Sequence, residues 1–166
     1  LMDGRVIEYN YFFRWLLVKG IILNTRPKKS AKAYKKIWWD EGSPLIVLSR
    51  RLFNKVEKRL NIPVALSMRY GSISILKGLN ELVEKGVSEV IVLPLYPHYA
   101  MSSYETVVEK VNDEIKSHFP EIKQTVIPPF YDDQKYIDVM CNSISQNLKG
   151  MEYDHILFSY HGIPES

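Results

Sequence analysis

The feature that most constrains the fold is an alternation of short apolar runs and longer amphipathic runs that begins at residue 43. Apolar runs of strand length occupy 63–69, 90–95, 124–127 and 155–159, and apolar residues recur at helical spacing over 44–60, 75–83, 107–115 and 136–148. Helices between apolar strands are typical of crossover connections. The sequence therefore predicts an α/β fold: a doubly wound parallel sheet of at least four strands, with helices on both faces.

The alternation stops before the predicted sheet is closed. No segment of helix length follows the strand expected at 155–159, so the α/β domain over 43–166 is expected to be incomplete. Residues 1–42 precede the alternation and are expected to form a separate N-terminal helical segment. Its most apolar part runs from Tyr11 to Leu23, where Arg14 and Lys19 interrupt it. This stretch is shorter than the roughly 20 apolar residues that a spanning helix needs, but it suits a helix lying at a membrane surface.

Composition restricts the class of protein but does not identify a binding partner. With 46% hydrophobic and 25% charged residues over 166 positions, the chain can build a core, and a disordered chain is excluded. A formal net charge of +3 is too small to argue for a nucleic-acid partner. The single cysteine, Cys141, excludes an internal disulfide framework and suits a reducing compartment, so the cytoplasm is expected.

Chemistry-bearing side chains gather where the predicted strands end. In open parallel sheets, ligands bind beyond the carboxyl ends of the strands. The candidates at this edge are Arg69, Tyr70, Tyr96, His98, Tyr99, Tyr160 and His161, with Ser102 and Ser103 at the start of the following helix. Aromatic rings, a guanidinium and a helix amino end suit a flat apolar ligand that carries acidic groups. An imidazole at this edge can accept a proton or bind a metal.

Each candidate also has a structural interpretation. A tyrosine at a strand end can be a core residue with its hydroxyl at the surface, and Arg69 can form a surface ion pair. Ser102 fits a capping box with Glu105. Two histidines without a nearby cysteine or paired carboxylate are a weak metal signal. His118 and His155 are expected to be structural, and the chain lacks the glycine-rich nucleotide motifs and the GxSxG elbow.

Five segments together resemble the ferrochelatase family. They are 23–30 with Tyr34 and Trp38, then 42–45, 68–71, 93–99 and 158–164, and they cover essentially the whole chain in the family's order. The last segment, Phe-Ser-Tyr-His-Gly-Ile-Pro, resembles the catalytic-histidine signature and contains His161. The arrangement is most similar to the bacterial protoporphyrin type. The run from Ala100 to Glu105 differs from the usual family pattern, which leaves the residues that meet the propionates open.

The resemblance implies a chelatase-like fold of two similar domains, of which this chain is the N-terminal part, truncated at both ends. It implies insertion of ferrous iron into protoporphyrin IX with release of two protons, with iron as a substrate and no prosthetic group. His161 is the implied catalytic residue and metal ligand. The implied substrate-binding residues are Arg69, Tyr70, Tyr96, His98, Tyr99, Ser102, Ser103 and Tyr160. The stretch from Tyr11 to Leu23 corresponds to the family's hydrophobic lip.

Three functions remain open from the sequence. The chain can belong to a protoporphyrin ferrochelatase, to a chelatase acting on coproporphyrin or another tetrapyrrole, or to a non-catalytic porphyrin or haem carrier. The aromatic edge fits all three, whereas the segments around His98 and His161 resemble ferrochelatase in detail. Because the family places the second wall of the cleft in the second domain, this chain alone is expected to be inactive.

Overall fold

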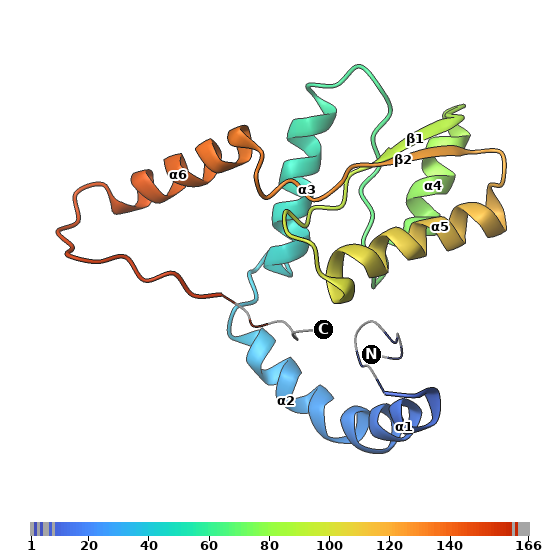
Figure 1. Cartoon of the computed structure of the whole chain (residues 1–166), viewed down its shortest axis with the longest axis horizontal. Coiled ribbons are helices and arrows are strands. Elements are labelled where there is room, and N and C mark those ends of the chain that lie inside the picture. The colour runs from blue at the N-terminus through green and yellow to red at the C-terminus, as the bar shows by residue number, and fades with distance from the viewer. Residues whose placement is uncertain (1, 3, 5–6, 8, 161, 163–166) are drawn as a thin grey trace.

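The computed structural model of the chain describes residues 2, 4, 7, 9–160 and 162. Figure 1 shows three regions: a strand and helix unit with β1, β2, α4 and α5, a helical N-terminal arm with α1 and α2, and α6, which projects away from the rest. Helix α3 (Pro44–Glu57) lies between them. The expected α/β class is confirmed, because helices alternate with a parallel sheet.

The sheet is built by one strand, helix, strand unit. Strand β1 (Glu89–Val92) pairs in parallel with β2 (Lys123–Val126), with Val90 opposite Gln124 and Val92 opposite Val126. The connection between them contains a short π-helix, η2 (Met101–Glu105), followed by α5 (Thr106–His118). Helix α4 (Ile75–Glu84) precedes β1. Both strands and both helices fall where the sequence predicted them.

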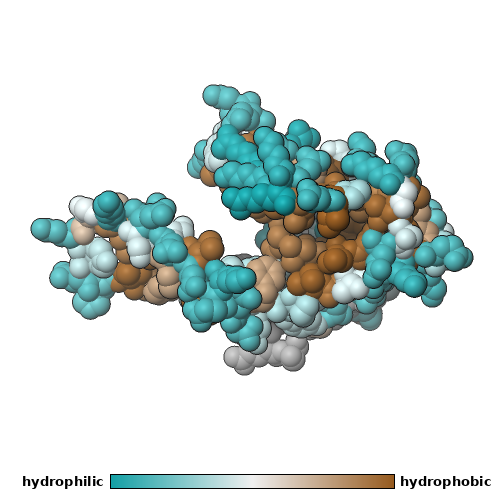
Figure 2. Space-filling view, turned by 90° about the horizontal axis from the view of Figure 1, so that it is seen from above, coloured by the Kyte–Doolittle hydropathy of each residue, from teal (hydrophilic) through white to brown (hydrophobic). Residues whose placement is uncertain are grey.

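The core lies on one face of this sheet. Val90 of β1 packs with Ile75 and Leu79 of α4 and with Val111 and Ile115 of α5. On the other face, the Ile91 side chain is 66% exposed. The expectation of helices on both faces is therefore wrong for the described residues. Figure 2 shows apolar residues gathering in the hollowed middle of the molecule, with hydrophilic residues around its rim.

Two of the four expected strands form in the part of the chain that the structure describes. The segment 63–69 forms only an isolated bridge between Met68 and Ser74, and 155–159 forms no strand. A strand needs a neighbour for its backbone N–H and C=O groups. Neither segment lies in register beside β1 or β2 here, so their apolar composition alone does not produce a ladder.

Helix boundaries follow local signals in the sequence. Ser74 and Asp133 are N-caps whose side-chain oxygens accept hydrogen bonds from the N–H groups of Lys77 (3.2 Å) and Tyr136 (3.1 Å). Gly86, with φ +78°, follows α4 in the left-handed conformation that glycine adopts easily. The helix expected over 44–60 ends three residues earlier, at Glu57.

The N-terminal arm is helical without a break in the chain. Helix α1 (Tyr11–Trp15), the π-helix η1 (Leu16–Ile22) and α2 (Leu23–Lys35) follow one another directly. Val18 is the one buried residue of these three elements, and every residue of α2 is exposed. None of the helices in the described ranges is long and apolar enough to cross a membrane.

Helix α6 (Gln134–Leu148) buries none of its residues. It extends away from the sheet, and the segment after it runs back toward the arm without forming regular structure (Figure 1). The apolar side chains of Val139 and Met140 on this helix are exposed, as is Leu157 beyond it at 94%. Apart from the edge-to-face contact of Tyr136 with Phe130, with ring centroids 5.5 Å apart, α6 is therefore held mainly by its own helical hydrogen bonds rather than by packing.

Candidate functional site

The loops that follow β1 and β2 meet at one edge of the sheet, as the sequence predicted. The N–H of Ile127 donates to the carbonyl of Val92 (2.9 Å), and the N–H of Phe130 donates to the carbonyl of Pro97 (3.0 Å). In the residues that directly follow Pro97 and Phe130, the His98 ring stacks on Tyr131, with ring centroids 5.7 Å apart and planes 14° from parallel. His98 is therefore positioned by a neighbour that the sequence analysis did not select as a site residue.

Tyr99 lies in the same loop and bonds to the start of the following helix. Its hydroxyl donates to the Glu105 carboxylate, and its ring lies 6.0 Å from that of Tyr104. The Tyr104 hydroxyl in turn donates to the Ile127 carbonyl (3.0 Å), which lies in the loop after β2. Tyr104 and Glu105 thus tie the two loops to η2. The sequence analysis did not select either residue for the site, because both were assigned to the start of a helix.

Arg69 reaches the beginning of α5 from a distant part of the chain. Its Nε donates to the carbonyl oxygen (2.9 Å) and to Oγ1 (3.1 Å) of Thr106, a residue that is only 2% exposed. The guanidinium lies 4.7 Å from the centre of the Tyr70 ring, a cation–π distance. The structure therefore joins Arg69 and Tyr70 to the helix that follows the β1 loop.

The capping role expected for the serines is wrong. Ser103 Oγ donates to the Ala100 carbonyl (3.5 Å), and no side chain caps η2. The Glu105 carboxylate accepts a hydrogen bond from Tyr99, and neither η2 nor α5 has the side-chain cap that a capping box provides. Ser102 is exposed beside these residues. Neither hydroxyl is needed to begin α5, which starts at Thr106.

Two tyrosines at the predicted edge show different surroundings. Tyr96 is in the loop after β1 and is exposed at 38%. Tyr160, at 82% exposed, follows the segment that forms no strand, and no hydrogen bond or ring contact joins it to the other candidates among the described residues. His161 lies outside the described residues. Among the residues described, no group of three His, Cys, Asp or Glu side chains is arranged to hold a metal ion.

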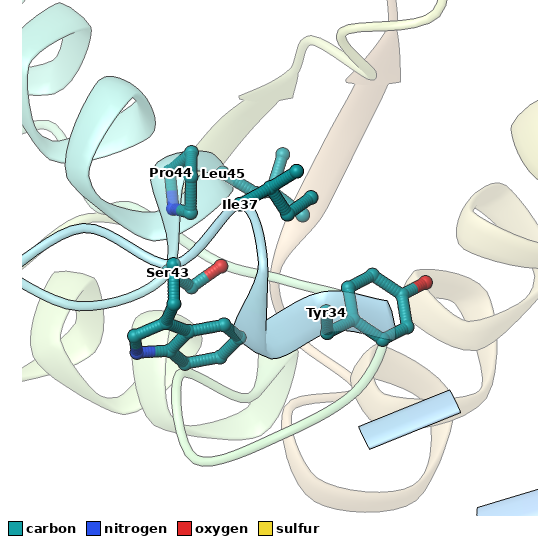
Figure 3. Close-up of a pocket in the computed structure, with 6 residues that line it drawn as sticks. Tyr34, Ile37, Ser43, Pro44 and Leu45 are labelled. Atoms are coloured by element: carbon teal, nitrogen blue, oxygen red, sulfur yellow. The ribbon is translucent and has the colours of Figure 1, made fainter. Parts of the chain in front are cut away.

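A shallow apolar pocket lies where α2 meets α3. It has a volume of about 360 Å³ and is lined by Tyr34, Ile37, Trp38, Ser43, Pro44 and Leu45. Figure 3 shows Ile37 beside Pro44 and Leu45, with Tyr34 and Ser43 at other sides of the junction. The sequence analysis quoted these segments as family motifs but did not predict a pocket.

The turn between α2 and α3 is fixed by a separate cluster. Arg51 donates to Glu41 (2.7 Å), and its guanidinium lies 5.6 Å from the centre of the Trp39 ring. Gly42, with φ +120°, allows the reciprocal backbone hydrogen bonds between Trp39 and Gly42. These contacts hold the ends of α2 and α3 in the arrangement that forms the pocket.

Comparison with known proteins identifies the class to which this fold and edge belong. A family model described as Ferrochelatase matches residues 1–166. Curated relatives named Ferrochelatase include those of Opitutus terrae, 46% identical over 167 residues, and Pseudomonas fluorescens biotype C, 44% identical over 166 residues. Each alignment covers 99% of this chain and 48% of the relative.

The chain belongs to the ferrochelatase family. It spans about half the length of the curated relatives it matches. No solved structure matches it significantly. The family predicted from the five motif segments is thereby confirmed, and the fold is assigned to the chelatase-like α/β class.

Proposed function

We propose that the complete protein is a ferrochelatase that inserts ferrous iron into protoporphyrin IX and releases two protons. The observation that carries this proposal is the match of the family model to the whole chain. The meeting of the two strand-end loops supports it, because they bring aromatic side chains to the edge where an open α/β sheet binds its ligand. Iron is a substrate in this reaction, and no prosthetic group is proposed.

His161 is proposed as the residue that serves metal insertion. Entry of Fe²⁺ into the macrocycle displaces two pyrrole N–H protons, so a neutral imidazole can accept a proton or hold the arriving metal. The motif around His161 and its place after the last apolar run support this role. It lies beyond the residues whose surroundings the structure describes, so the proposal rests on sequence and family.

The porphyrin is proposed to lie against the loops after β1 and β2. Arg69 has a guanidinium suited to a propionate, and Tyr70 lies beneath it. The aromatic rings at this edge offer stacking surfaces for the macrocycle. Ser102 and Ser103, near the start of η2, offer hydroxyl groups. The proposed substrate-binding residues are Arg69, Tyr70, Tyr96, His98, Tyr99, Ser102, Ser103 and Tyr160.

The remaining half of the protein is proposed to complete the sheet and the cleft. Residues 43–166 would be one incomplete domain, with 63–69 and 155–159 joining β1 and β2 to give at least four parallel strands. The exposed apolar side chains of α6 and of Leu157 support this, because packing elsewhere in a complete domain would cover them. Residues 1–42 would form the lip and the helical segment.

Contact of the lip with a membrane surface is part of the same proposal. Tyr11, Phe12, Trp15 and Leu16 are exposed on α1 and the start of η1, which suits the boundary between lipid headgroups and acyl chains. We place the protein in the cytoplasm with peripheral attachment through the stretch from Tyr11 to Leu23. Changing Trp15 to Glu should reduce flotation with liposomes, and unchanged flotation would contradict the contact.

The metallation proposal is tested with the complete protein. Zinc insertion into protoporphyrin IX should proceed with the wild type and fall by at least about 100-fold in a His161→Ala variant, while porphyrin binding persists. His155→Ala is the matched control and should retain activity. Porphyrin binding without turnover by the wild type would favour a carrier, and faster turnover of coproporphyrin would favour the alternative substrate.

A further inference from the structure

Three consecutive residues at the junction of η2 and α5 each bond to a different segment of the candidate site. The Tyr104 hydroxyl donates to a carbonyl in the loop after β2, and the Glu105 carboxylate accepts a hydrogen bond from Tyr99 in the loop after β1. Thr106, the first residue of α5, accepts from Arg69, which lies 37 residues earlier in the chain. The junction therefore fixes residues that are proposed to bind the porphyrin.

The hydrogen bonds between Arg69 and Thr106 use one nitrogen of the guanidinium. The Arg69 Nε donates both to the Thr106 carbonyl oxygen (2.9 Å) and to Thr106 Oγ1 (3.1 Å). A guanidinium carries its other four N–H groups on the two terminal nitrogens, which form the fork that pairs with a carboxylate. Because the group is planar and rigid, fixing the direction of the Nε–H bond also restricts the direction in which this fork points.

The Arg69 side chain connects a buried anchor with an exposed ring. Thr106 is 2% exposed, Arg69 is half-buried, and Tyr70 is 60% exposed. The guanidinium lies 4.7 Å from the centre of the Tyr70 ring. A hydrogen bond to a buried hydroxyl is shielded from water, which strengthens it. The anchor at Thr106 therefore holds Arg69 more firmly than a solvent-exposed partner would.

The Thr106 hydroxyl can be removed without changing the shape of the side chain. Valine at this position has no oxygen for Nε, whereas the backbone carbonyl of residue 106 still accepts. Arg69 would then keep one of its two hydrogen bonds to this residue and would gain freedom to rotate. Loss of the hydroxyl should therefore weaken what Arg69 binds rather than unfold the helix.

We propose that Thr106 is a positioning residue that directs the guanidinium of Arg69 toward a carboxylate of the substrate. The inference rests on the proposed function, in which Arg69 meets a propionate, and it assigns a role to a residue that is itself buried away from the ligand. It follows that Thr106 contributes to the recognition of the acidic groups of the porphyrin and not to the recognition of the macrocycle.

Fluorescence titration of the complete protein with protoporphyrin IX and with its dimethyl ester tests the inference. The two porphyrins share the macrocycle, but the ester has no free carboxylate. Thr106→Val should weaken binding of the free acid by about 10-fold, as expected for loss of a hydrogen bond to a charged group, and should leave binding of the ester within about 2-fold. Thr106→Ser keeps the hydroxyl and should bind the free acid as the wild type does.

Thr125→Val is the matched control, because this threonine is exposed on β2. It should change the affinity for neither porphyrin. Circular dichroism checks that each variant is folded, and Thr106→Ala, which removes the hydroxyl without adding bulk, replaces Thr106→Val if the valine variant does not fold.

Thr106→Val in an Arg69→Ala background separates positioning from packing. Because Thr106 is proposed to act through Arg69, the second substitution should change the affinity for the free acid by less than about 2-fold once the guanidinium is absent. Equal weakening of both porphyrins, the same loss with Thr106→Ser, or an undiminished loss in the Arg69→Ala background would overturn the inference in favour of a structural role.

The wild type separates this inference from the proposed function. No binding of protoporphyrin IX by the wild type would overturn both. Binding by the wild type with no difference between Thr106→Val and Thr125→Val would overturn only the role of Thr106.

Discussion

The unit of β1, α5 and β2 with α4 differs from the two flanks of the molecule in what its apolar residues contact. In the unit, Leu79 and Val111 are buried against Val90. In the flanks, α6 buries none of its residues, and the N-terminal arm buries only Val18 among its helical elements. The flanks are nevertheless as apolar in sequence as the unit. Apolar composition alone therefore does not bury a segment. Burial also requires neighbouring helices or strands against which its apolar side chains can pack.

Truncating a buried side chain in the core should give the largest difference in stability between the unit and the flanks. Leu79→Ala removes buried methyl groups between α4, α5 and β1, so it should lower the free energy of unfolding by about 3 kcal/mol. Leu157→Ala, at a residue that is 94% exposed, should change it by less than about 0.5 kcal/mol. Urea denaturation followed by circular dichroism measures both. Equal losses would show that the flank is packed in solution.

A pair of glycine substitutions probes how closely the chain crosses α4. A Cβ on Gly78 would collide with Ser67 Oγ, whereas on Gly20 of η1 it would meet only Leu16 Cδ1, at 3.8 Å. Gly78→Val should therefore destabilise the unit by about 2 kcal/mol, because the segment 65–67 must move. Gly20→Val should have little effect on the same unfolding transition. A neutral Gly78→Val would indicate that 65–67 does not lie against α4.

Two helix caps of the same geometry sharpen the comparison with a smaller effect. Ser74→Ala removes the cap of α4 and should lower the free energy of global unfolding by about 1 kcal/mol. Asp133→Ala removes the cap of α6 and should reduce helix content without shifting the unfolding of the core, because α6 is not packed against it. Hydrogen exchange can assign each loss to its helix. A global loss from Asp133→Ala would contradict the separation.

Sequence reasoning succeeded where contacts are close in the chain. Helices α4, α5 and α6 and strands β1 and β2 follow from apolar spacing in the sequence. The strands expected at 63–69 and 155–159 do not form among the described residues, because an apolar run specifies a strand only when a neighbour supplies hydrogen bonds. The apolar pattern of a segment does not show which strands lie beside it in the fold.

The candidate site was predictable in position but not in partners. The strand-end rule brought the loops containing His98 and Tyr131 together correctly. The contact between Arg69 and Thr106 spans 37 residues, and no local pattern encodes it. Glu105 was assigned to a capping box because its spacing from Ser102 fits one, whereas the Tyr99 hydroxyl, a competitor for its carboxylate, is visible only in three dimensions.

The central claim is that this chain carries one wall of a metallation site that the rest of a ferrochelatase completes. The most direct measurement is zinc insertion into protoporphyrin IX by the 166-residue chain alone, by the remaining half of the protein alone, and by the two mixed. The account predicts turnover only in the mixture, and none when the mixture contains the His161→Ala variant. Turnover by the 166-residue chain alone would contradict it.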